Sequence, residues 1–333
     1  MFFKVTTGDI FYTIPASEGL REAEDTVANL CREQMITYDN EAIVSAWLDA
    51  ELEKMRATGT GFHFLILRDI AQCSQEAGYP IVALGNLSGS LIAYLLGITE
   101  MDPFEYYTPE MVWGSDANPI TPDCTIGIAP QVRPLLPKYL DARHGFVAGD
   151  KELFRQISLI DVHTCEQLGA LEQATGKKPS ACDLNHAIYL RVASDILEDY
   201  SKESGGLIEG FKEDWSFHSL LRLFAFTKGT FDLKKLNLND PNFFATRDEF
   251  FNRLVQYGIP ADIALDIVKK GVWSSGTQRE KYVQTLQSYH VPKIIMDYFD
   301  GVGHLWTVSA CIDRLLHQCY VAWYQEYFPE AFM

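Results

Sequence analysis

The sequence predicts an α+β fold that is predominantly helical, because three patterns divide its 333 residues. Apolar residues recur every three or four positions along most of the chain, which is the spacing of one helix face. A short apolar run at 81–84 is typical of a strand and leads into a turn rich in glycine and serine. Six prolines crowd residues 107–150, where they exclude long helices and leave 124–128 as the favoured strand.

Residues that favour helix ends mark the boundaries of several predicted helices. Gly78 and Gly258 each follow a run with helical spacing, as residues after a helix often do. Thr246 is a suitable N-cap, and Pro260 stands at the first turn of the next helix. Asp161 is likewise expected to be an N-cap, and residues 202–206 are expected to form a solvated connector. The predicted helices span residues 22–35, 40–57, 62–77, 161–174, 186–200, 216–227, 246–257, 261–270 and 304–327.

The charge of the chain argues against strong binding of nucleic acid by the chain alone. It carries 28 Lys and Arg against 45 Asp and Glu, a net charge of -17. Proteins that bind DNA unaided usually show a basic surface, since phosphate contacts supply most of the non-specific affinity. The longest basic runs here are only pairs, such as those at 234–235 and 269–270. A local basic groove is still compatible with this composition.

The cysteines and the apolar runs of the sequence indicate the cellular compartment of the protein. The seven cysteines form no CxxC pair, which is typical of reduced thiols in the cytoplasm. No apolar run approaches the roughly 20 residues of a membrane span, and the start of the chain lacks the pattern of a signal peptide. We therefore expect a cytoplasmic protein with no membrane partner.

The turn after the first predicted strand is a candidate phosphate site. It contains Gly85, Asn86, Gly89 and Ser90 and opens an apolar helix. Backbone N–H groups at such a turn can bind a phosphate. Close packing of a helix against a strand also favours small residues, so both interpretations stay open.

Several segments, in the same order, resemble the bacterial C-family DNA polymerase III alpha subunits, of the PolC type. The resemblance implies a DNA-directed DNA polymerase, a nucleotidyltransferase. It further implies a truncated palm-like region with the glycine turn over 1–205 and a helical fingers-like region over 206–333. The segments that carry it are 51–62, 79–103, 161–176, 217–230, 245–258 and 323–333.

The catalytic residues that the resemblance implies are largely replaced. In the family, two aspartates one residue apart on a palm strand and a third on a neighbouring strand hold two divalent metals. Here the three positions carry Asp123, Thr125 and Ser158. One carboxylate cannot hold two Mg²⁺ ions, which need oxygen ligands from several groups. Asp116 and Asp161 are candidate substitutes, although no spacing requires them.

The phosphate-binding cations implied by the resemblance are replaced as well. An arginine normally precedes the glycine turn, where this chain has Leu84, and the family's lysine and histidine fall near Val308 and Ala310. A triphosphate would lose its charge-assisted contacts at these positions. We therefore expect a degenerate polymerase with a remnant phosphate loop. No cofactor is expected, and Mg²⁺ would be needed if any activity survives.

Three functional hypotheses follow from these observations. The first is a catalytically inactive relative with an accessory or decoy role in DNA replication, acting through replication proteins or weak contact with DNA. The second is an active DNA-directed nucleotidyltransferase with relocated metal ligands, which needs another acidic residue close to Asp123. The third is a protein–protein interaction module unrelated to DNA.

Ordinary structural roles are expected for the other candidate residues. Asp161 with His163 and Cys165 offers metal-ligand types, but an N-cap and a core thiol explain Asp161 and Cys165. Glu51 and Glu53 are expected on a solvated helix face. The aromatic residues of 215–226 and 305–323 follow helical spacing, so we expect them in the core rather than stacked on bases.

Overall fold

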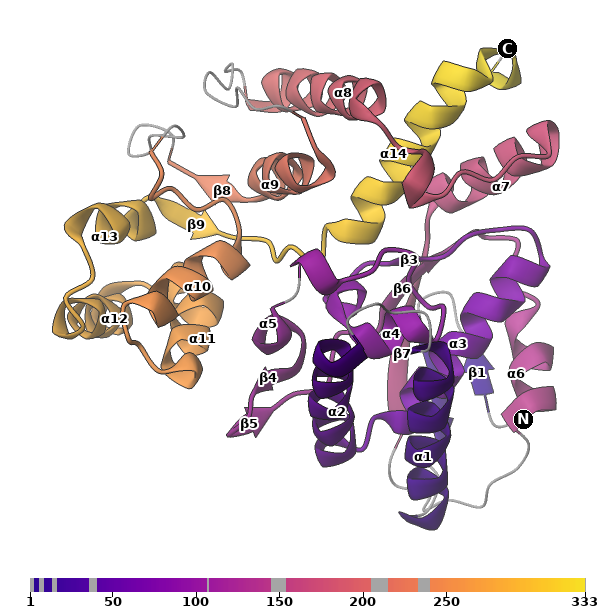
Figure 1. The fold of residues 1–333 in the computed structure, drawn as a ribbon, viewed down its shortest axis with the longest axis horizontal. Helices are drawn as coiled ribbons and strands as arrows, with labels where there is room; N and C mark the ends of the chain where they lie inside the picture. Colours follow the sequence, from indigo (N-terminus) through magenta and orange to yellow (C-terminus); the bar gives the residue numbers. More distant parts are fainter. Residues whose placement is uncertain are drawn as a thin grey trace.

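The computed structural model describes residues 3–5, 9–13, 17–35, 41–106, 108–144, 154–204, 215–232 and 240–332. This part of the chain is mainly helical, as the sequence predicts, and it contains three small sheets, where the sequence predicts one. Figure 1 shows the largest sheet beneath helices α1–α4, with α10–α13 gathered at the opposite side and α7, α8, α9 and α14 above. The α+β class is thereby confirmed.

The main sheet has five strands in the order β1-β2-β7-β6-β3. Only β6 and β7 run parallel, and the other neighbours are antiparallel. The predicted strands at 81–84 and 124–128 are confirmed as β3 and β6, whereas no sequence signal pointed to β1 and β2. The strands are β1 (Phe3–Val5), β2 (Asp9–Thr13), β3 (Val82–Ala83), β6 (Thr125–Ile128) and β7 (Phe154–Asp161).

Six helices pack with this sheet around one apolar core. The three long helices that precede the glycine turn are confirmed within one residue at each end, except that α1 begins five residues earlier than predicted. Phe64 and Trp113 are completely buried in this region and stack with ring centroids 5.7 Å apart. The helices are α1 (Ser17–Gln34), α2 (Glu41–Thr58), α3 (Gly61–Glu76), α4 (Leu91–Leu95), α5 (Pro109–Trp113) and α6 (Leu136–His144), and the short sheet β4 (Gly114–Ser115) with β5 (Asn118–Pro119) follows α5.

A second apolar core joins α7 (His163–Thr175), α8 (His186–Ser204), α9 (Phe217–Lys228) and α14 (Ile312–Tyr327). Cys165 is fully buried, as expected. The expected N-cap at Asp161 is wrong, because this residue ends β7 and Val162 occupies the cap position. The solvated connector at 202–206 is also wrong in part, since α8 continues to residue 204, while 205–206 lie outside the described residues.

A third apolar core is built by α10 (Arg247–Gln256), α11 (Ala261–Lys270), α12 (Gly276–Ser288) and α13 (Lys293–Asp300). The predicted N-cap is confirmed, since the Thr246 hydroxyl accepts a hydrogen bond from the Glu249 N–H. The 3-10 turn η5 (Gly271–Trp273) directly follows α11.

The last helix begins eight residues later than expected. Residues 302–304 form β9 (Val302–His304), which pairs with β8 (Thr230–Phe231). The intervening segment 305–311 buries Leu305 and Cys311 although it precedes the helix. Apolar spacing continued through this buried irregular segment, so the predicted start at 304 is wrong.

All seven cysteines are free thiols, in agreement with the sequence prediction. Within the described residues, no helix combines the length and the apolar character that a membrane span requires.

Candidate functional site

The glycine turn lies between β3 and α4, as the sequence predicts. Residues Leu87–Gly89 form a single 3-10 turn, η2, and Ser90 then caps α4 through its hydroxyl, which accepts from the Ala93 N–H at 3.3 Å. The N–H groups of Gly89 and Ser90 donate to the carbonyls of Asn86 and Leu87. The turn therefore uses several of its own donors internally.

The remaining donors at the start of α4 are held by Glu51, a residue expected on a solvated face. That expectation is wrong, because Glu51 is only 1% exposed. Its carboxylate accepts from the N–H groups of Leu91 (3.0 Å) and Ile92 (3.1 Å) and from the Ser90 hydroxyl (2.7 Å). A carboxylate of the chain thus satisfies the N–H groups that an external phosphate would need. Glu53, by contrast, is exposed as expected.

Asp123 and Gly85 are brought into direct contact. A Cβ atom on Gly85 would lie 2.5 Å from the Asp123 Cγ and 2.7 Å from its carbonyl oxygen, so only glycine fits here. Asn86 also holds Asp123 against the turn, since the Asn86 Oδ1 accepts a hydrogen bond from the Asp123 N–H at 2.7 Å. The Asn86 amide also donates to the Met111 carbonyl at 2.8 Å. The candidate residues of the turn and Asp123 form one packed unit.

Gly89 lies at a second point where two segments of the chain pack closely against each other. Its Cβ would lie 2.8 Å from the Cβ of Ser309 and 2.9 Å from a methyl group of Val112. The small residue therefore allows the turn to pack against the segment before α14.

The carboxylate of Asp123 accepts two hydrogen bonds from the residue two positions further along the chain. Its Oδ1 accepts from the Thr125 hydroxyl at 2.6 Å and from the Thr125 N–H at 3.1 Å. Thr125 stands opposite Ser158 in the parallel register of β6 and β7. Of the three positions that the family resemblance implies, Thr125 and Ser158 are thus partners in this sheet, and Asp123 lies two residues before β6 with its carboxylate on Thr125.

The two proposed substitute carboxylates are engaged elsewhere. Asp116 pairs with Lys54 at 2.9 Å, and Asp161 pairs with Arg133 at 2.6 Å. Asp161 is three residues beyond Ser158 on β7, roughly 10 Å along the strand. Among the described residues, no group of three or more Asp, Glu, His or Cys is arranged to hold a metal ion.

An arginine from a distant part of the chain contacts Leu84, where the resemblance implies an arginine in the sequence itself. Arg314, from the first turn of α14, donates from its Nη2 to the Leu84 carbonyl at 3.3 Å. Its guanidinium lies over the Trp306 ring at 5.1 Å, and burial lowers its pKa. Sequence reasoning missed this residue because it is 230 positions away from the turn.

The neighbouring Asp313 ties α14 to the strand before the turn. Its Oδ2 accepts from the Ala83 N–H at 3.1 Å. Burial of the carboxyl raises its pKa to about 7. Near the positions where the resemblance implies a lysine and a histidine, the backbone N–H groups of Val308 and Ala310 donate to the side chains of Asp248 and Thr307.

The described residues thus place a glycine turn at the start of a helix and bring one aspartate, just before the adjoining strand, against that turn. Comparison with known proteins shows a similarity over part of the chain. Residues 22–162 match the family model described as bacterial DNA polymerase III alpha NTPase domain. The resemblance inferred from the sequence is thereby confirmed, and the chain carries a DNA polymerase III alpha-like region.

Individual relatives agree with this match. The chain is 26% identical over 231 residues to the DNA polymerase III subunit alpha of Yersinia pestis, which covers 67% of this chain and 18% of that protein. It is 40% identical over 60 residues to the subunit of Escherichia coli O6:H1, covering 18% of this chain and 5% of that protein. The DNA polymerase III PolC-type of Streptococcus sanguinis is 29% identical over 114 residues, covering 33% and 7%. The chain thus spans a small part of each relative's length.

Proposed function

We propose that this chain is a catalytically inactive relative of the DNA polymerase III alpha subunits with an accessory or decoy role in DNA replication. The observation that carries the proposal is the hydrogen bonding of the Asp123 carboxylate. Its Oδ1 is bound by the hydroxyl and N–H of Thr125, which stands where the family has its second aspartate. Two Mg²⁺ ions need several carboxylate oxygens, so these residues do not fit the metals of the polymerase reaction.

The glycine turn supports the same proposal. In a working nucleotide loop the N–H groups at the helix start bind phosphate. Here Glu51 accepts from the N–H groups of Leu91 and Ile92 and from the Ser90 hydroxyl. We infer that the turn is a structural remnant that connects β3 to α4.

The proposed role places the chain in the cytoplasm, in contact with replication proteins or weakly with DNA. We further propose a palm-like region over 1–205 and a fingers-like region over 206–333. The net charge of -17 favours protein contacts, since like charge repels the phosphate backbone of DNA.

A primer-extension assay with Mg²⁺ or Mn²⁺ tests the proposed inactivity. We expect no incorporation by the wild-type chain at any primer end. Asp123→Asn is the test variant, and Asp116→Asn is its control because Asp116 is exposed and paired with Lys54. Incorporation that Asp123→Asn abolishes and Asp116→Asn leaves intact would overturn the proposal.

A second candidate function, an active nucleotidyltransferase with relocated ligands, is favoured by one observation. In the strand register, Asp9 of β2 is the partner of Ser158, which in turn is the partner of Thr125. An aspartate therefore stands one strand away from the position of the missing third carboxylate. Asp9→Asn is included in the same assay, and loss of incorporation in this variant would establish the relocated ligand.

A further inference from the structure

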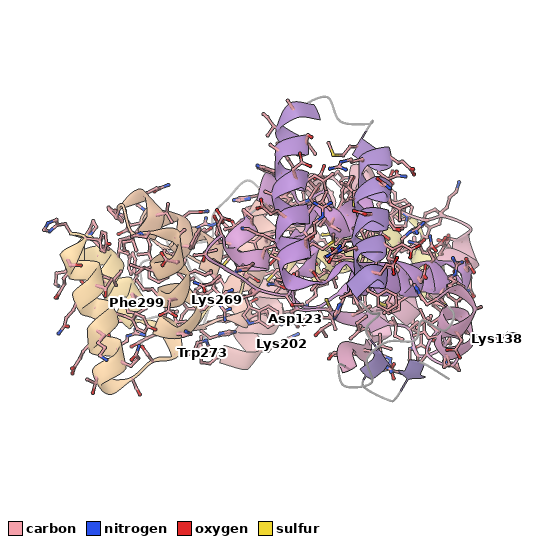
Figure 2. The ribbon with its side chains drawn as sticks, turned by 90° about the horizontal axis from the view of Figure 1, so that it is seen from below. Asp123, Lys138, Lys202, Lys269, Trp273 and Phe299 are labelled. Carbon is pink, nitrogen blue, oxygen red and sulfur yellow. The ribbon has the colours of Figure 1, made fainter. Side chains whose placement is uncertain are left out.

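A groove lies between helices α3 and α6, outside the glycine turn and its neighbours. The two helices lie side by side (Figure 1), and the Tyr139 hydroxyl of α6 donates to the Glu76 carboxylate of α3 at 2.7 Å. Figure 2 shows Lys138 of α6 at the edge of the molecule, apart from Asp123. The groove has a volume of about 500 Å³, which is in the range of small-molecule sites.

Apolar side chains form most of the lining of this groove. Leu135, Tyr139 and Ala142 follow helical spacing along α6 and its preceding residue, so they share one face, opposite Cys73 and Ala77 at the end of α3. Leu135 is 47% exposed although its side chain is large and apolar. Burial raises the pKa of the Cys73 thiol, so the thiol stays neutral and adds to the apolar surface. This lining favours a ligand with a hydrocarbon part.

The charged side chains at the groove leave an excess of positive charge. They are Glu76, Lys138 and Arg143, so two cations against one carboxylate give a net charge of +1. Glu76 already pairs with Arg143 at 3.4 Å. Lys138 is exposed and takes part in no ion pair among the described residues. In a chain of net charge -17, a locally positive groove favours an anionic group on the ligand.

Tyr139 and Arg143 form a fixed wall of the groove. The Arg143 guanidinium lies 4.3 Å from the centre of the Tyr139 ring, and its Nη2 donates to the Tyr139 hydroxyl at 2.6 Å. Its Nη1 is 3.8 Å from Asp69, a second carboxylate on α3. Burial and, next, the hydrogen bond to Glu76 raise the pKa of Tyr139 to about 12, so the phenol stays neutral. Lys138 is therefore the cation at the groove that is free to turn toward a ligand.

The size of the groove favours a small molecule over a folded partner. From Leu135 to Ala142 the helix advances roughly 10 Å, at 1.5 Å per residue. A stable protein interface takes roughly 20–30 residues from each side, whereas eight residues line this groove.

We propose that the groove between α3 and α6 binds an alkyl carboxylate of medium length. Its hydrocarbon chain lies on Leu135, Tyr139 and Ala142, and its carboxylate pairs with Lys138. The site uses neither Asp123 nor the glycine turn, so it goes beyond the proposed function and does not depend on it.

Isothermal titration calorimetry of the whole chain with sodium decanoate, below the concentration at which it forms micelles, tests the site. We expect saturable binding of one decanoate per chain. Decylamine carries the same hydrocarbon chain with the opposite charge, and it should bind about 10-fold more weakly or less, because like charges repel. Acetate carries the carboxylate without the chain and should not bind measurably, since burial of the hydrocarbon supplies most of the affinity.

A charge reversal at the groove tests the role of Lys138. Lys138→Glu should weaken decanoate roughly 10-fold and strengthen decylamine, so the preference between the two ligands reverses. Lys281→Glu is the matched control, because Lys281 is also exposed, has no ion pair among the described residues and lies on α12. It changes the net charge equally and should leave both affinities within about twofold, as expected for an exposed charge outside the groove.

A steric block tests the place of the hydrocarbon chain. Ala142→Trp puts a large ring at an exposed position of the groove and should abolish decanoate binding. Ala170→Trp, at an exposed position of α7, is its control and should bind as the wild type does. Circular dichroism melts show whether each variant is folded, and the four exposed positions give two independent pairs of variants.

Four results overturn the inference: no saturable binding of decanoate, equal affinities for decanoate and decylamine, an unchanged preference in Lys138→Glu, or full binding by Ala142→Trp. Sedimentation velocity tests the other occupant of such a groove, a second copy of the chain. A dimer that Ala142→Trp dissociates and decanoate does not would likewise overturn the inference. Primer extension is measured separately, so incorporation of nucleotides would refute the proposed inactivity and leave the groove as a binding site.

Discussion

The strongest prediction about stability concerns Glu51, the carboxylate buried against the start of α4. Glu51→Ala removes the acceptor of two backbone N–H groups and of the Ser90 hydroxyl, all of them buried. A buried donor left without a partner costs about 1–3 kcal/mol, and the hydroxyl can turn toward another acceptor. The two N–H groups therefore set the expected loss of unfolding free energy at about 2–6 kcal/mol. This is a large share of the roughly 5–15 kcal/mol of a typical domain.

Equilibrium unfolding in urea, followed by circular dichroism, measures this loss. Glu51→Gln should lose less, about 1–3 kcal/mol, because one amide oxygen still accepts while the amide nitrogen faces a donor. Glu53→Ala is the control, since this glutamate lies on the same helix but is exposed, and it should change stability by less than about 0.5 kcal/mol. Equal losses in Glu51→Ala and Glu53→Ala would refute the interpretation of the buried carboxylate.

Two further predictions concern other groups around the candidate sites. Burial raises the pKa of Asp313 to about 7, so the folded chain holds a proton that the unfolded chain releases, and stability should fall between about pH 4 and pH 7 by at most ~4 kcal/mol. Asp313→Asn should flatten this fall in thermal melts across that range, and parallel curves for the two proteins would contradict the assignment. Gly85→Ala should destabilise the chain by about 1–3 kcal/mol, because its Cβ meets Asp123, and Asp123→Ala in the same chain should restore only part of the loss since the carbonyl oxygen still clashes.

Local signals in the sequence were sufficient for most helices and for the glycine turn. The helix at 261–270 after Pro260 and the cap at Thr246 depend on neighbouring residues alone, and both are observed. The start of the last helix was mispredicted, since a buried irregular segment and a helix both place apolar residues at 305 and 308. Burial pattern alone does not separate the two structures.

Contacts between distant residues account for what the sequence did not reveal. A glutamate on an amphipathic helix looks the same whether it faces water or the N–H groups of a helix 39 residues further on, as Glu51 does. The family resemblance directed attention to Thr125 and Ser158, which the strand register pairs, but no pattern marked Arg314.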